Sequence, residues 1–398
     1  MEKTWVNVPD VLFFQEGPGV RNTQYTSDGV KLLNVANLID GNIDLSKSDR
    51  YISEEEAYGK YKHFLCDEGD FIVASSGIKV EYIDKKMGFV ENTMLPLCMN
   101  TSTIRFKSLD QEKLRIRYFM YYLKSNHFKR QLFKQITGSA QLNYGPSHLK
   151  KMMVPLTDIE KQDRIIAELD RTQNIINKYE KELMLLDKLI KARFVEMFGD
   201  PLVEGNRYPK VPLGSLTEVG SSKRIFEKEY VSEGIPFYRT KEIVELSKGN
   251  RITTELFITK TRYDEIRSTY GVPQKGDLLI SAVGTIGVIW IVDGNNDFYF
   301  KDGNLLRVSA SEKFIPEYLK YLLDILISAY KQEMSSGTAY AALTISALKK
   351  MMVYDVPLVE QEGFADFVHQ VDKSKAAVQK ALDETQLLFD SLMQEYFG

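Results

Sequence analysis

The sequence of 398 residues has little of what builds disulfide frameworks, metal sites or membrane spans. Its two cysteines, Cys66 and Cys98, are far apart and show no CxxC spacing, which indicates a reducing compartment rather than a disulfide framework. The four histidines are scattered without zinc-ligand spacing. No run of about 18 apolar residues occurs, and the N-terminus lacks an apolar signal core. We therefore expect a cytoplasmic protein with no membrane segment and no metal.

Motifs that mark an enzyme are also missing. We find no GxxxxGK[ST] phosphate loop, no GxGxxG after a strand, no HExxH and no GxSxG nucleophile turn. Asp200-Pro201 is followed by Leu202, so the tetrad typical of amino-methyltransferases (acidic or amide residue, Pro-Pro, aromatic residue) is absent. The stretch 284–287 (GTIG) has two glycines and no following lysine, which favours a turn between strands over a nucleotide cradle. We expect no catalytic residue and no cofactor in this chain.

The charge is close to balanced, with a net charge of -3 and a pI near 6.0. Domains that bind nucleic acid alone are often strongly basic, so the average charge of this chain does not by itself indicate a nucleic-acid-binding protein. The tracts 158–198 and 355–397 hold about 18 acidic and 11 basic residues, which leaves roughly 37 acidic and 41 basic residues elsewhere. The remainder is mildly basic. At 43% hydrophobic residues, the chain is long enough for two sizeable cores.

The sequence repeats at a shift of 199 positions. Gly138-Ser139-Ala140 returns as Gly337-Thr338-Ala339, and Met197-Phe198-Gly199 returns as Tyr396-Phe397-Gly398. The stretch LKKMMV at 149–154 returns at 348–353. The similarity is clearest in the last third of each half. A tandem duplication of this kind predicts two-fold pseudosymmetry with two unlike surfaces, which suits an asymmetric target in two parts.

Two long helices are predicted from a heptad pattern. The first tract, 158–197, places apolar residues at one seam, with two more at the alternate position: Leu169, Ile176, Leu183, Ile190, Met197, Tyr179 and Leu186. The shifted tract gives Val368, Lys375, Leu382, Phe389, Tyr396, Val371, Val378 and Leu392. Two helices of about 40 residues would each span roughly 60 Å as a coiled coil. Two separate surface helices are the alternative.

The segments before the long helices carry strand and turn signals. The clearest are 276–281 (GDLLIS) and 284–292, with a weaker version at 68–77. A shorter helix is expected in each half, over 117–134 and over 316–334. We predict an α+β fold with four segments, namely a first globular domain at 1–155, a first spacer helix at 156–199, a second globular domain at 200–354 and a second spacer helix at 355–398. Gly199-Asp200-Pro201 should end the first long helix.

A series of motifs in the second half resembles one known family. The motifs are 211–216 (VPLGSL), 234–239 (GIPFYR), 276–281 (GDLLIS), 284–287 (GTIG), and Gly337-Thr338-Ala339 before Leu348-Lys349-Lys350. This series is similar to a target-recognition domain of Type I restriction-modification specificity (S) subunits. In the first half, 17–24 (GPGVRNTQ) precedes 29–34 (GVKLLN), which parallels 234–239. There Ser75-Ser76-Gly77 stands in place of a longer Ser-x-x-Gly-Thr-x-Gly stretch. The resemblance covers nearly the whole chain.

The resemblance implies a non-catalytic specificity subunit of a methyltransferase and endonuclease complex. It implies two β-rich target-recognition domains separated by two long antiparallel coiled-coil helices, arranged as a pseudo-two-fold tandem repeat. Each domain would read one half of a bipartite, asymmetric site in double-stranded DNA. Two methyltransferase subunits would dock on the helices, and restriction subunits with translocase and nuclease activity would join them. Half-sites about one turn (roughly 34 Å) apart need a spacer of this scale.

Loop residues with hydrogen-bond donors and acceptors are the candidates for DNA contacts. In the first half they are Arg21, Asn22, Gln24, Ser75 and Gln141. In the second half they are Lys223, Arg224, Arg239, Lys241, Ser281, Thr285, Thr338 and Tyr340. Ordinary solvated surface explains any single one of them equally well. The shared loops at 138–141 and 337–340 are equally compatible with phosphate contacts and with a turn that caps the preceding helix.

Two other functions stay open at this point. One is a coiled-coil scaffold whose β-rich domains bind protein or carbohydrate. The other is a nuclease or methyltransferase with an unrecognised site, which the missing motifs disfavour. Sequence-selective retention on duplex DNA, with a methyltransferase subunit present, would separate the DNA reader from the scaffold.

Overall fold

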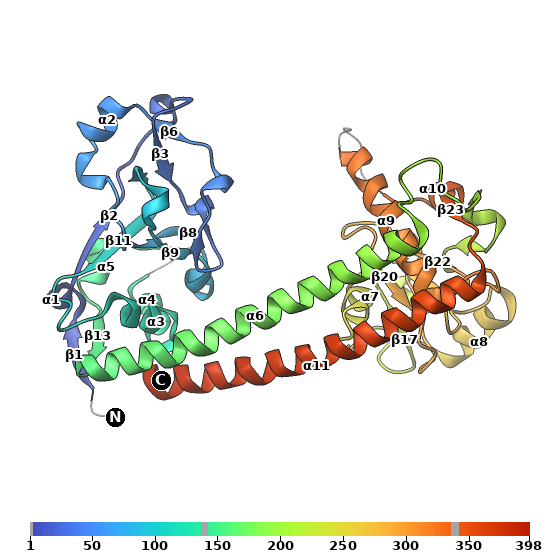
Figure 1. Cartoon of the computed structure of the whole chain (residues 1–398). Helices are drawn as coiled ribbons and strands as arrows, with labels where there is room; N and C mark the ends of the chain where they lie inside the picture. Colours follow the sequence, from blue (N-terminus) through green and yellow to red (C-terminus); the bar gives the residue numbers. More distant parts are fainter. Residues whose placement is uncertain (1–2, 137–141, 336–341) are drawn as a thin grey trace. The chain divides into compact units, whose positions relative to one another are not determined.

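The computed structural model describes residues 3–136, 142–335 and 342–398 (Figure 1). It divides into two compact units. Unit 1 contains residues 1–179 and 381–398, and unit 2 contains residues 180–380. The two long helices, α6 (Ile159–Phe198) and α11 (Leu358–Phe397), run through both units. Each unit therefore consists of one globular domain with one half of each long helix packed on it.

A four-stranded sheet lies at the centre of each unit. In unit 1 its order is β2 (Leu12–Glu16), β11 (Thr103–Ser108), β7 (Phe71–Ala74) and β9 (Met87–Phe89). In unit 2 its order is β15 (Val219–Gly220), β22 (Leu305–Val308), β19 (Leu278–Ser281) and β20 (Ile289–Ile291). All four residues of β7 and of β19 are buried, because short unbroken apolar runs form strands that are covered on both faces.

A second sheet in each unit contains a parallel pair. In unit 1 it consists of β10 (Leu97–Met99), β3 (Val30–Leu33) and β6 (Tyr51–Ile52). In unit 2 it consists of β16 (Tyr230–Val231), β18 (Phe257–Ile258), β17 (Ile235–Tyr238) and β21 (Tyr299–Phe300). The parallel neighbours are β3 with β10, and β17 with β21. Gly29 and Gly234 precede β3 and β17 with φ of +112° and +149°, and a Cβ atom at either would lie 2.3 Å from a backbone oxygen. Each parallel strand therefore requires its glycine.

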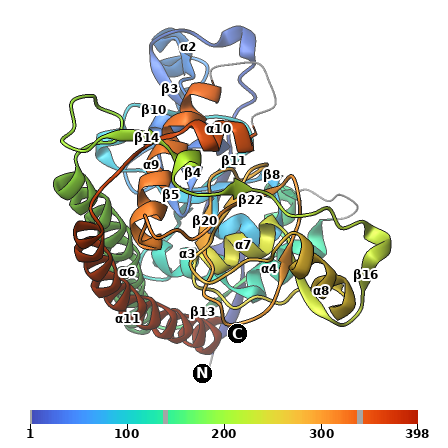
Figure 2. The same ribbon diagram turned by 90° about the vertical axis from the view of Figure 1, so that its right-hand side faces the viewer.

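The remaining elements complete both units. Unit 1 also contains β1 (Thr4–Asn7), α1 (Val8–Val11), β4 (Leu38–Ile39), β5 (Asn42–Ile43), α2 (Glu54–Tyr58), β8 (Ser76–Ile78), α3 (Ile116–Lys124), α4 (Asn126–Gln135), β12 (Leu142–Asn143), α5 (Pro146–Leu149) and β13 (Met153–Leu156). Unit 2 also contains β14 (Lys210–Pro212), α7 (Thr240–Ser247), α8 (Lys260–Thr269), α9 (Pro316–Ser335), α10 (Ile345–Lys350) and β23 (Met352–Tyr354). In Figure 2, α9 lies beside the long helices, and α8 lies on the side of unit 2 away from those helices.

The predicted helix pair is confirmed by the two cores. The core of unit 1 includes Leu169 and Ile176 from the first half of α6, together with Phe389 and Leu392 from the last half of α11. The core of unit 2 takes Ile190 and Phe194 of α6, and Phe364, Val368 and Val371 of α11. The beginning of one helix therefore lies beside the end of the other in both units, which makes the pair antiparallel. Lys375, a polar seam residue, forms an ion pair with Asp187 at 2.7 Å.

A buried glutamine near the start of each long helix forms hydrogen bonds to the globular domain that precedes the helix. The Gln162 amide accepts a hydrogen bond from the backbone N–H of Arg115 and donates to the carbonyls of Lys113 and Thr157. Gln361, 199 positions later, accepts from Ile315 and donates to Lys313 and Val356. The repeat has therefore kept the same three hydrogen bonds in both copies.

Replacing Gln361 with leucine is expected to lower the free energy of unfolding by about 2–3 kcal/mol, because three buried backbone groups lose their partner. Gln370→Leu, an exposed position on the same helix, is the control. Chemical denaturation of both variants measures the difference. A Gln361→Leu protein as stable as the control would show that water replaces the amide.

Two local predictions can be compared with the structure. The helix expected over 117–134 is divided at Ser125, whose backbone is extended and whose hydroxyl accepts a hydrogen bond from Phe128 N–H as the N-cap of α4. The single-helix prediction was therefore wrong there, whereas α9 is continuous in the other half. Gly199, with φ of +79°, ends α6 as expected. No helix in the described part of the chain is long and apolar enough to cross a membrane.

Candidate nucleic-acid interface

The candidate residues of unit 1 that the structure describes lie on segments near one end of the central sheet, where β2 and β7 end and β11 begins. The short helical turn Asn22–Gln24 follows the exposed Arg21. The Gln24 amide nitrogen donates to Glu56 at 2.7 Å and to the Tyr61 hydroxyl at 3.1 Å, which holds the turn against α2. Within the described ranges, the guanidinium of Arg21 has no hydrogen-bond or ion-pair partner in this chain, so its donors are free.

A chain of polar contacts links this turn to the end of β7. Asn100 Nδ2 lies 3.5 Å from the Tyr25 hydroxyl and 2.9 Å from Asn34 Oδ1. Two residues later, the Ser102 carbonyl accepts from Ser75 N–H. Ser102 itself has φ of +68°, a left-handed conformation that costs energy for a serine, and its hydroxyl lies 2.6 Å from that of Ser76. The loop at 100–102 is therefore held in a strained conformation at the same end of the sheet.

The candidate residues of unit 2 meet at the equivalent end of its sheet. Ser221 Oγ donates to Leu305 O, and Ala282 N–H donates to Asn304 O, so the segments after β15 and β19 lie at the start of β22. Arg224 forms an ion pair with Asp302 at 2.7 Å. The Lys223 N–H donates to the Tyr299 hydroxyl at 2.6 Å. Three segments far apart in the sequence, at 221–224, at 282 and at 299–305, are thus brought together.

Arg239 begins α7 and is partly committed to this chain. Its backbone N–H donates to Glu242 Oε2 at 2.8 Å, and its guanidinium lies 3.1 Å from Glu242 Oε1. The Glu242 carboxylate is 2% exposed, whereas the Arg239 side chain is 38% exposed. The hydrogen bond to Glu242 raises the pKa of Arg239 above its usual value. Arg239 can therefore present part of its guanidinium to an acceptor while it neutralises a buried carboxylate. Lys241 and Thr285 are exposed.

Two of the predicted site residues are buried and take structural roles instead. Ser281 is fully buried, and its hydroxyl donates to Thr285 O and accepts from Val288 N–H, which closes the loop between β19 and β20. Ser75, at the matching position after β7, is also buried. Neither hydroxyl can reach DNA, so we exclude both from the interface. Gln141, Thr338 and Tyr340 lie outside the described residues.

The structure adds residues that sequence patterns did not single out. Arg50 lies over the ring of Tyr25 at 5.2 Å, next to the turn at 22–24. Lys301 joins the unit 2 cluster because its N–H donates to Tyr238 O, just before Arg239. Neither residue stands in a motif. Only the pairing of distant strands brings them to these positions.

The two clusters have the chemistry of a DNA contact surface. Arginine, lysine, asparagine and glutamine supply the donors that read guanine and adenine edges and hold phosphates. In both units they lie on loops at the end of a rigid sheet, where binding residues are commonly placed. In the part of the chain that the structure describes, no group of three or more His, Cys, Asp or Glu residues could hold a metal ion.

Comparison with known proteins agrees with this arrangement. A protein of Haemophilus influenzae, named as a type I restriction enzyme specificity subunit, is 26% identical over 277 residues, which is 68% of either chain. The MjaX specificity subunit of Methanocaldococcus jannaschii is 23% identical over 389 residues, covering 89% of this chain and 84% of that protein.

Solved structures show the same fold. The S subunit of a Type I restriction-modification system from M. genitalium has a TM-score of 0.54 at 16% identity, covering 100% of this chain and 96% of that one. A chain from work on complex assembly and conformational transition of the type I system has a TM-score of 0.57 at 17% identity, covering 99% and 97%. The model of the Type I restriction modification DNA specificity domain matches twice, at residues 24–185 and 207–385. Since these two matches take in most of both globular domains and most of both long helices, the chain belongs to the family of Type I restriction-modification specificity subunits.

Proposed function

We propose that this chain reads a bipartite, asymmetric DNA site, with the loop cluster of unit 1 on one half-site and that of unit 2 on the other. The observation that carries the proposal is the meeting of donor-bearing loops at the equivalent sheet end in both units. The clusters differ in nearly every side chain, with Arg21, Asn22 and Arg50 in one and Lys223, Arg224 and Arg239 in the other. Different donors read different bases, so unlike clusters suit unlike half-sites.

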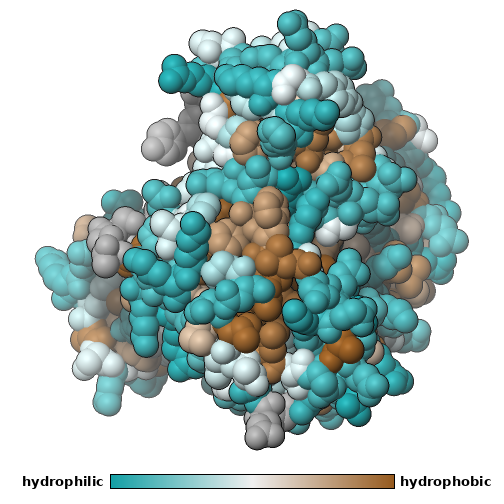
Figure 3. Space-filling view, turned by 90° about the vertical axis from the view of Figure 1, so that its left-hand side faces the viewer, coloured by the Kyte–Doolittle hydropathy of each residue, from teal (hydrophilic) through white to brown (hydrophobic). Residues whose placement is uncertain are grey.

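The proposal includes docking of two methyltransferase subunits. Exposed apolar side chains on the long helices support it: Met184, Leu185 and Leu189 in unit 2, and Leu387 and Leu388 in unit 1. Figure 3 shows further hydrophobic surface in the middle of the face of unit 1 that it draws. Trp5 of β1 and Phe13 of β2 are exposed in the same unit. Exposed apolar side chains that gather on one element are typical of protein contacts.

In this proposal the chain itself catalyses no reaction and supplies only specificity. Methyl transfer belongs to the docked subunits, and DNA translocation and cleavage belong to restriction subunits that join the complex. A cytoplasmic location is part of the same proposal, because chromosomal DNA is the substrate.

The proposal is tested by mapping N6-methyladenine in cells that carry a type I methyltransferase subunit, with and without this chain. We expect methylation at one asymmetric, two-part site only when the chain is present. The purified chain incubated with S-adenosylmethionine and DNA should give no methylation above background. Methylation by the chain alone, or a methylome that does not change when the chain is removed, would contradict the proposal.

Arg21→Ala should relax recognition of the half-site read by unit 1 and leave the other half-site intact, because the guanidinium of Arg21 is free. A good bidentate contact to guanine contributes about 1–3 kcal/mol of discrimination. Lys223→Ala is the reciprocal variant in unit 2. Arg239→Ala is less suitable, because it leaves the buried Glu242 without its cation. Methylome mapping of both variants measures the result, and an equal loss at both half-sites would assign Arg21 to phosphate binding.

A further inference from the structure

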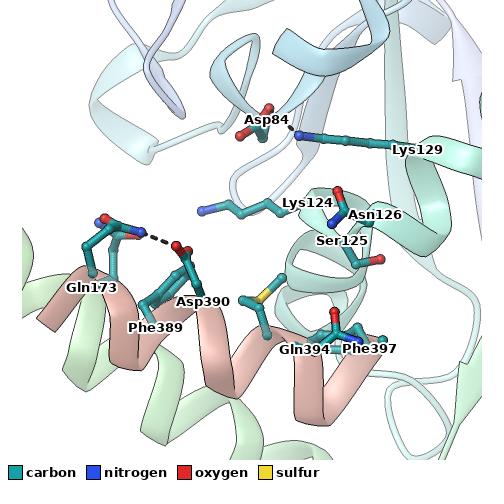
Figure 4. A pocket seen from close by; sticks show the side chains of 13 residues that line it. Asp84, Lys124, Ser125, Asn126, Lys129, Gln173, Phe389, Asp390, Gln394 and Phe397 are labelled. Carbon is teal, nitrogen blue, oxygen red and sulfur yellow. Dashed lines mark hydrogen bonds and ion pairs between the residues drawn. The ribbon is translucent and has the colours of Figure 1, made fainter. Parts of the chain in front are cut away.

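A cavity of about 570 Å³ in unit 1 lies between α3, α4 and the last turns of α11 (Figure 4). The Lys124 side chain extends into it from the end of α3. Two acidic groups line the same cavity, and each has a partner other than Lys124, a cation in one case and a neutral amide in the other. Asp84 is paired with Lys129 at 3.0 Å, and Asp390 accepts a hydrogen bond from the Gln386 amide at 3.0 Å.

No carboxylate lies within ion-pair distance of the Lys124 ammonium among the described residues, and the ammonium has no hydrogen-bond partner there either. It lies over the ring of Tyr121, at 5.2 Å from the ring centroid. Burial lowers the pKa of Lys124 below its usual value. A cation that is half-buried and has no carboxylate within ion-pair distance contributes nothing to stability and costs part of its hydration. The presence of a lysine at this half-buried position is therefore better explained by function than by stability.

Unit 2 contains a second cavity of about 540 Å³, between α9, the loop at 284–288 and the long helices. Its two aspartates are also occupied, because Asp324 pairs with Lys191 at 2.8 Å and Asp187 pairs with Lys375 at 2.7 Å. Lys320 is left over. Within the described part of the chain its ammonium has no hydrogen-bond or ion-pair partner and lies 5.7 Å from the ring centroid of Tyr321, and burial lowers its pKa.

The two tyrosines occupy equivalent positions, but the two lysines do not. Tyr121 and Tyr321 are 200 positions apart, one more than the general shift, because the hydrogen bonds of Gln162 and Gln361 match Lys113 with Lys313 and Arg115 with Ile315 at the start of α3 and α9. Lys124 follows its tyrosine by three residues, whereas Lys320 precedes its tyrosine by one. An unpaired ammonium therefore lies over the same ring in both units, although it comes from a different turn of the helix.

The neighbouring polar contacts have diverged. On the same two helices, Arg117 pairs with Asp170 at 2.6 Å, whereas the corresponding Glu317 pairs with His369 at 3.2 Å. The acidic residue lies on the long helix α6 in unit 1 and on α9 in unit 2. Both units therefore have a lysine ammonium over this tyrosine ring, although the polar contacts around it differ. This is expected if two identical partner subunits bind the same chemical group on both units.

We propose that each cavity receives a carboxylate side chain from one methyltransferase subunit, with Lys124 as its cation in unit 1 and Lys320 in unit 2. This inference rests on the proposed function, in which two copies of one subunit dock on two unlike globes. A carboxylate supplies the missing counter-charge, and the tyrosine ring keeps the ammonium oriented toward the cavity in its absence.

A DNA phosphate is the other anion that a lysine could take. The cavity of unit 1 is lined by residues of both long helices, α6 and α11. The turn at 22–24, in contrast, is held by Glu56 of α2. In Figure 1, α2 and β6 lie at the end of unit 1 away from those helices. DNA seated on the recognition loops would therefore meet the opposite side of the unit, which favours a protein carboxylate.

The test uses the full chain and the type I methyltransferase subunit from the same genome. Lys124→Met, Lys320→Met and the double variant remove one or both ammonium groups and keep the length of the side chain. We expect each single variant to weaken one of the two binding events by about ten- to a hundredfold, and the double variant to weaken both. Titration calorimetry gives affinities and stoichiometry. Lys60→Met is the matched control, because Lys60 lies over Tyr61 at 4.8 Å but is exposed.

Three outcomes would overturn the inference. The first is unchanged affinity and stoichiometry in the double variant while the unaltered chain binds two subunits. The second is a loss of duplex-DNA binding by the double variant alone, with subunit binding intact, which would assign the lysines to phosphate. The third is a lowered melting temperature of the free variants, because removal of an unpaired buried charge should leave stability unchanged or raise it. Failure of the unaltered chain to bind the subunit would instead contradict the proposed function itself.

Discussion

Replacing Arg105 with leucine is expected to destabilise unit 1 by about 2–3 kcal/mol, because the buried Asp70 carboxylate loses one of its two cations and keeps Lys107, which also lies at 3.0 Å. Arg105 Nη1 lies 3.0 Å from Asp70 Oδ2, and the two side chains are 6% and 2% exposed. The same guanidinium donates to the carbonyls of Leu65 and His63, which carry the chain from α2 to β7. The substitution therefore removes a charge partner and two backbone contacts together.

Arg307 offers a matched control in unit 2. It occupies the same place in the sheet, since Arg105 pairs with Ile72 and Arg307 with Leu279, each two residues after the aspartate. The Arg307–Asp277 distance is 3.9 Å, and Asp277 keeps hydrogen bonds from the N–H groups of Gln274 and Ala310. Arg307→Leu should therefore cost less, on the order of 1–2 kcal/mol. Thermal unfolding followed by calorimetry compares the two variants. Equal losses would show that Asp70 is satisfied without Arg105.

A half-chain of residues 1–199 is expected to dimerise and to redirect methylation to a palindromic site. The core of unit 1 needs Phe389, Leu392 and Phe397 from α11, so the half-chain alone leaves an apolar surface open. The α6 helix of a second copy can cover it, because the repeat places Ile190 and Phe198 at the positions of Phe389 and Phe397. Two copies of the first globe would then read two copies of the first half-site.

Charge makes this symmetric pairing weaker than the natural one. The repeat places Lys191 at the position of Asp390, so Lys124 and Lys191 of the second copy would share one cavity. Lys191→Asp in the half-chain removes this second ammonium and restores the aspartate that lines the cavity in the full chain, and we expect it to tighten the dimer by at least about tenfold. Lys188→Asp changes the net charge equally at an exposed position and is the control.

Sedimentation measures the dimerisation of the half-chain, and methylome mapping with a methyltransferase subunit measures its target. If the half-chain is a folded monomer, the α6 helix of a second copy does not take the place of α11, and the prediction is wrong. A dimer that keeps the asymmetric target would refute the assignment of one half-site to each globe. A dimer that Lys191→Asp and Lys188→Asp strengthen equally would show that only net charge matters.

Local patterns in the sequence were enough to predict the helix pair and the central strands. The seam residues Leu169, Ile176 and Ile190 are buried, because heptad spacing places them on one face of a helix whatever the rest of the chain does. The apolar runs at 71–74 and 278–281 form central strands for the same kind of reason. The helix boundary at Ser125 was missed, since a serine within a periodic apolar stretch does not by itself indicate whether it continues or caps a helix.

Whether a polar side chain is buried, paired or free to bind a ligand depends on tertiary contacts instead. Ser75 and Ser281 carry hydroxyls suited to DNA, but the strands next to them bury both residues. Arg239 stands in a recognisable motif, and only the fold of α7 pairs it with Glu242. Lys124 and Lys320 look like ordinary helix lysines in the sequence. Because burial and the choice of partner are set by segments that are distant in the chain, the repeat and the heptads could determine the architecture, whereas only the packed structure decided which charges are left without a partner.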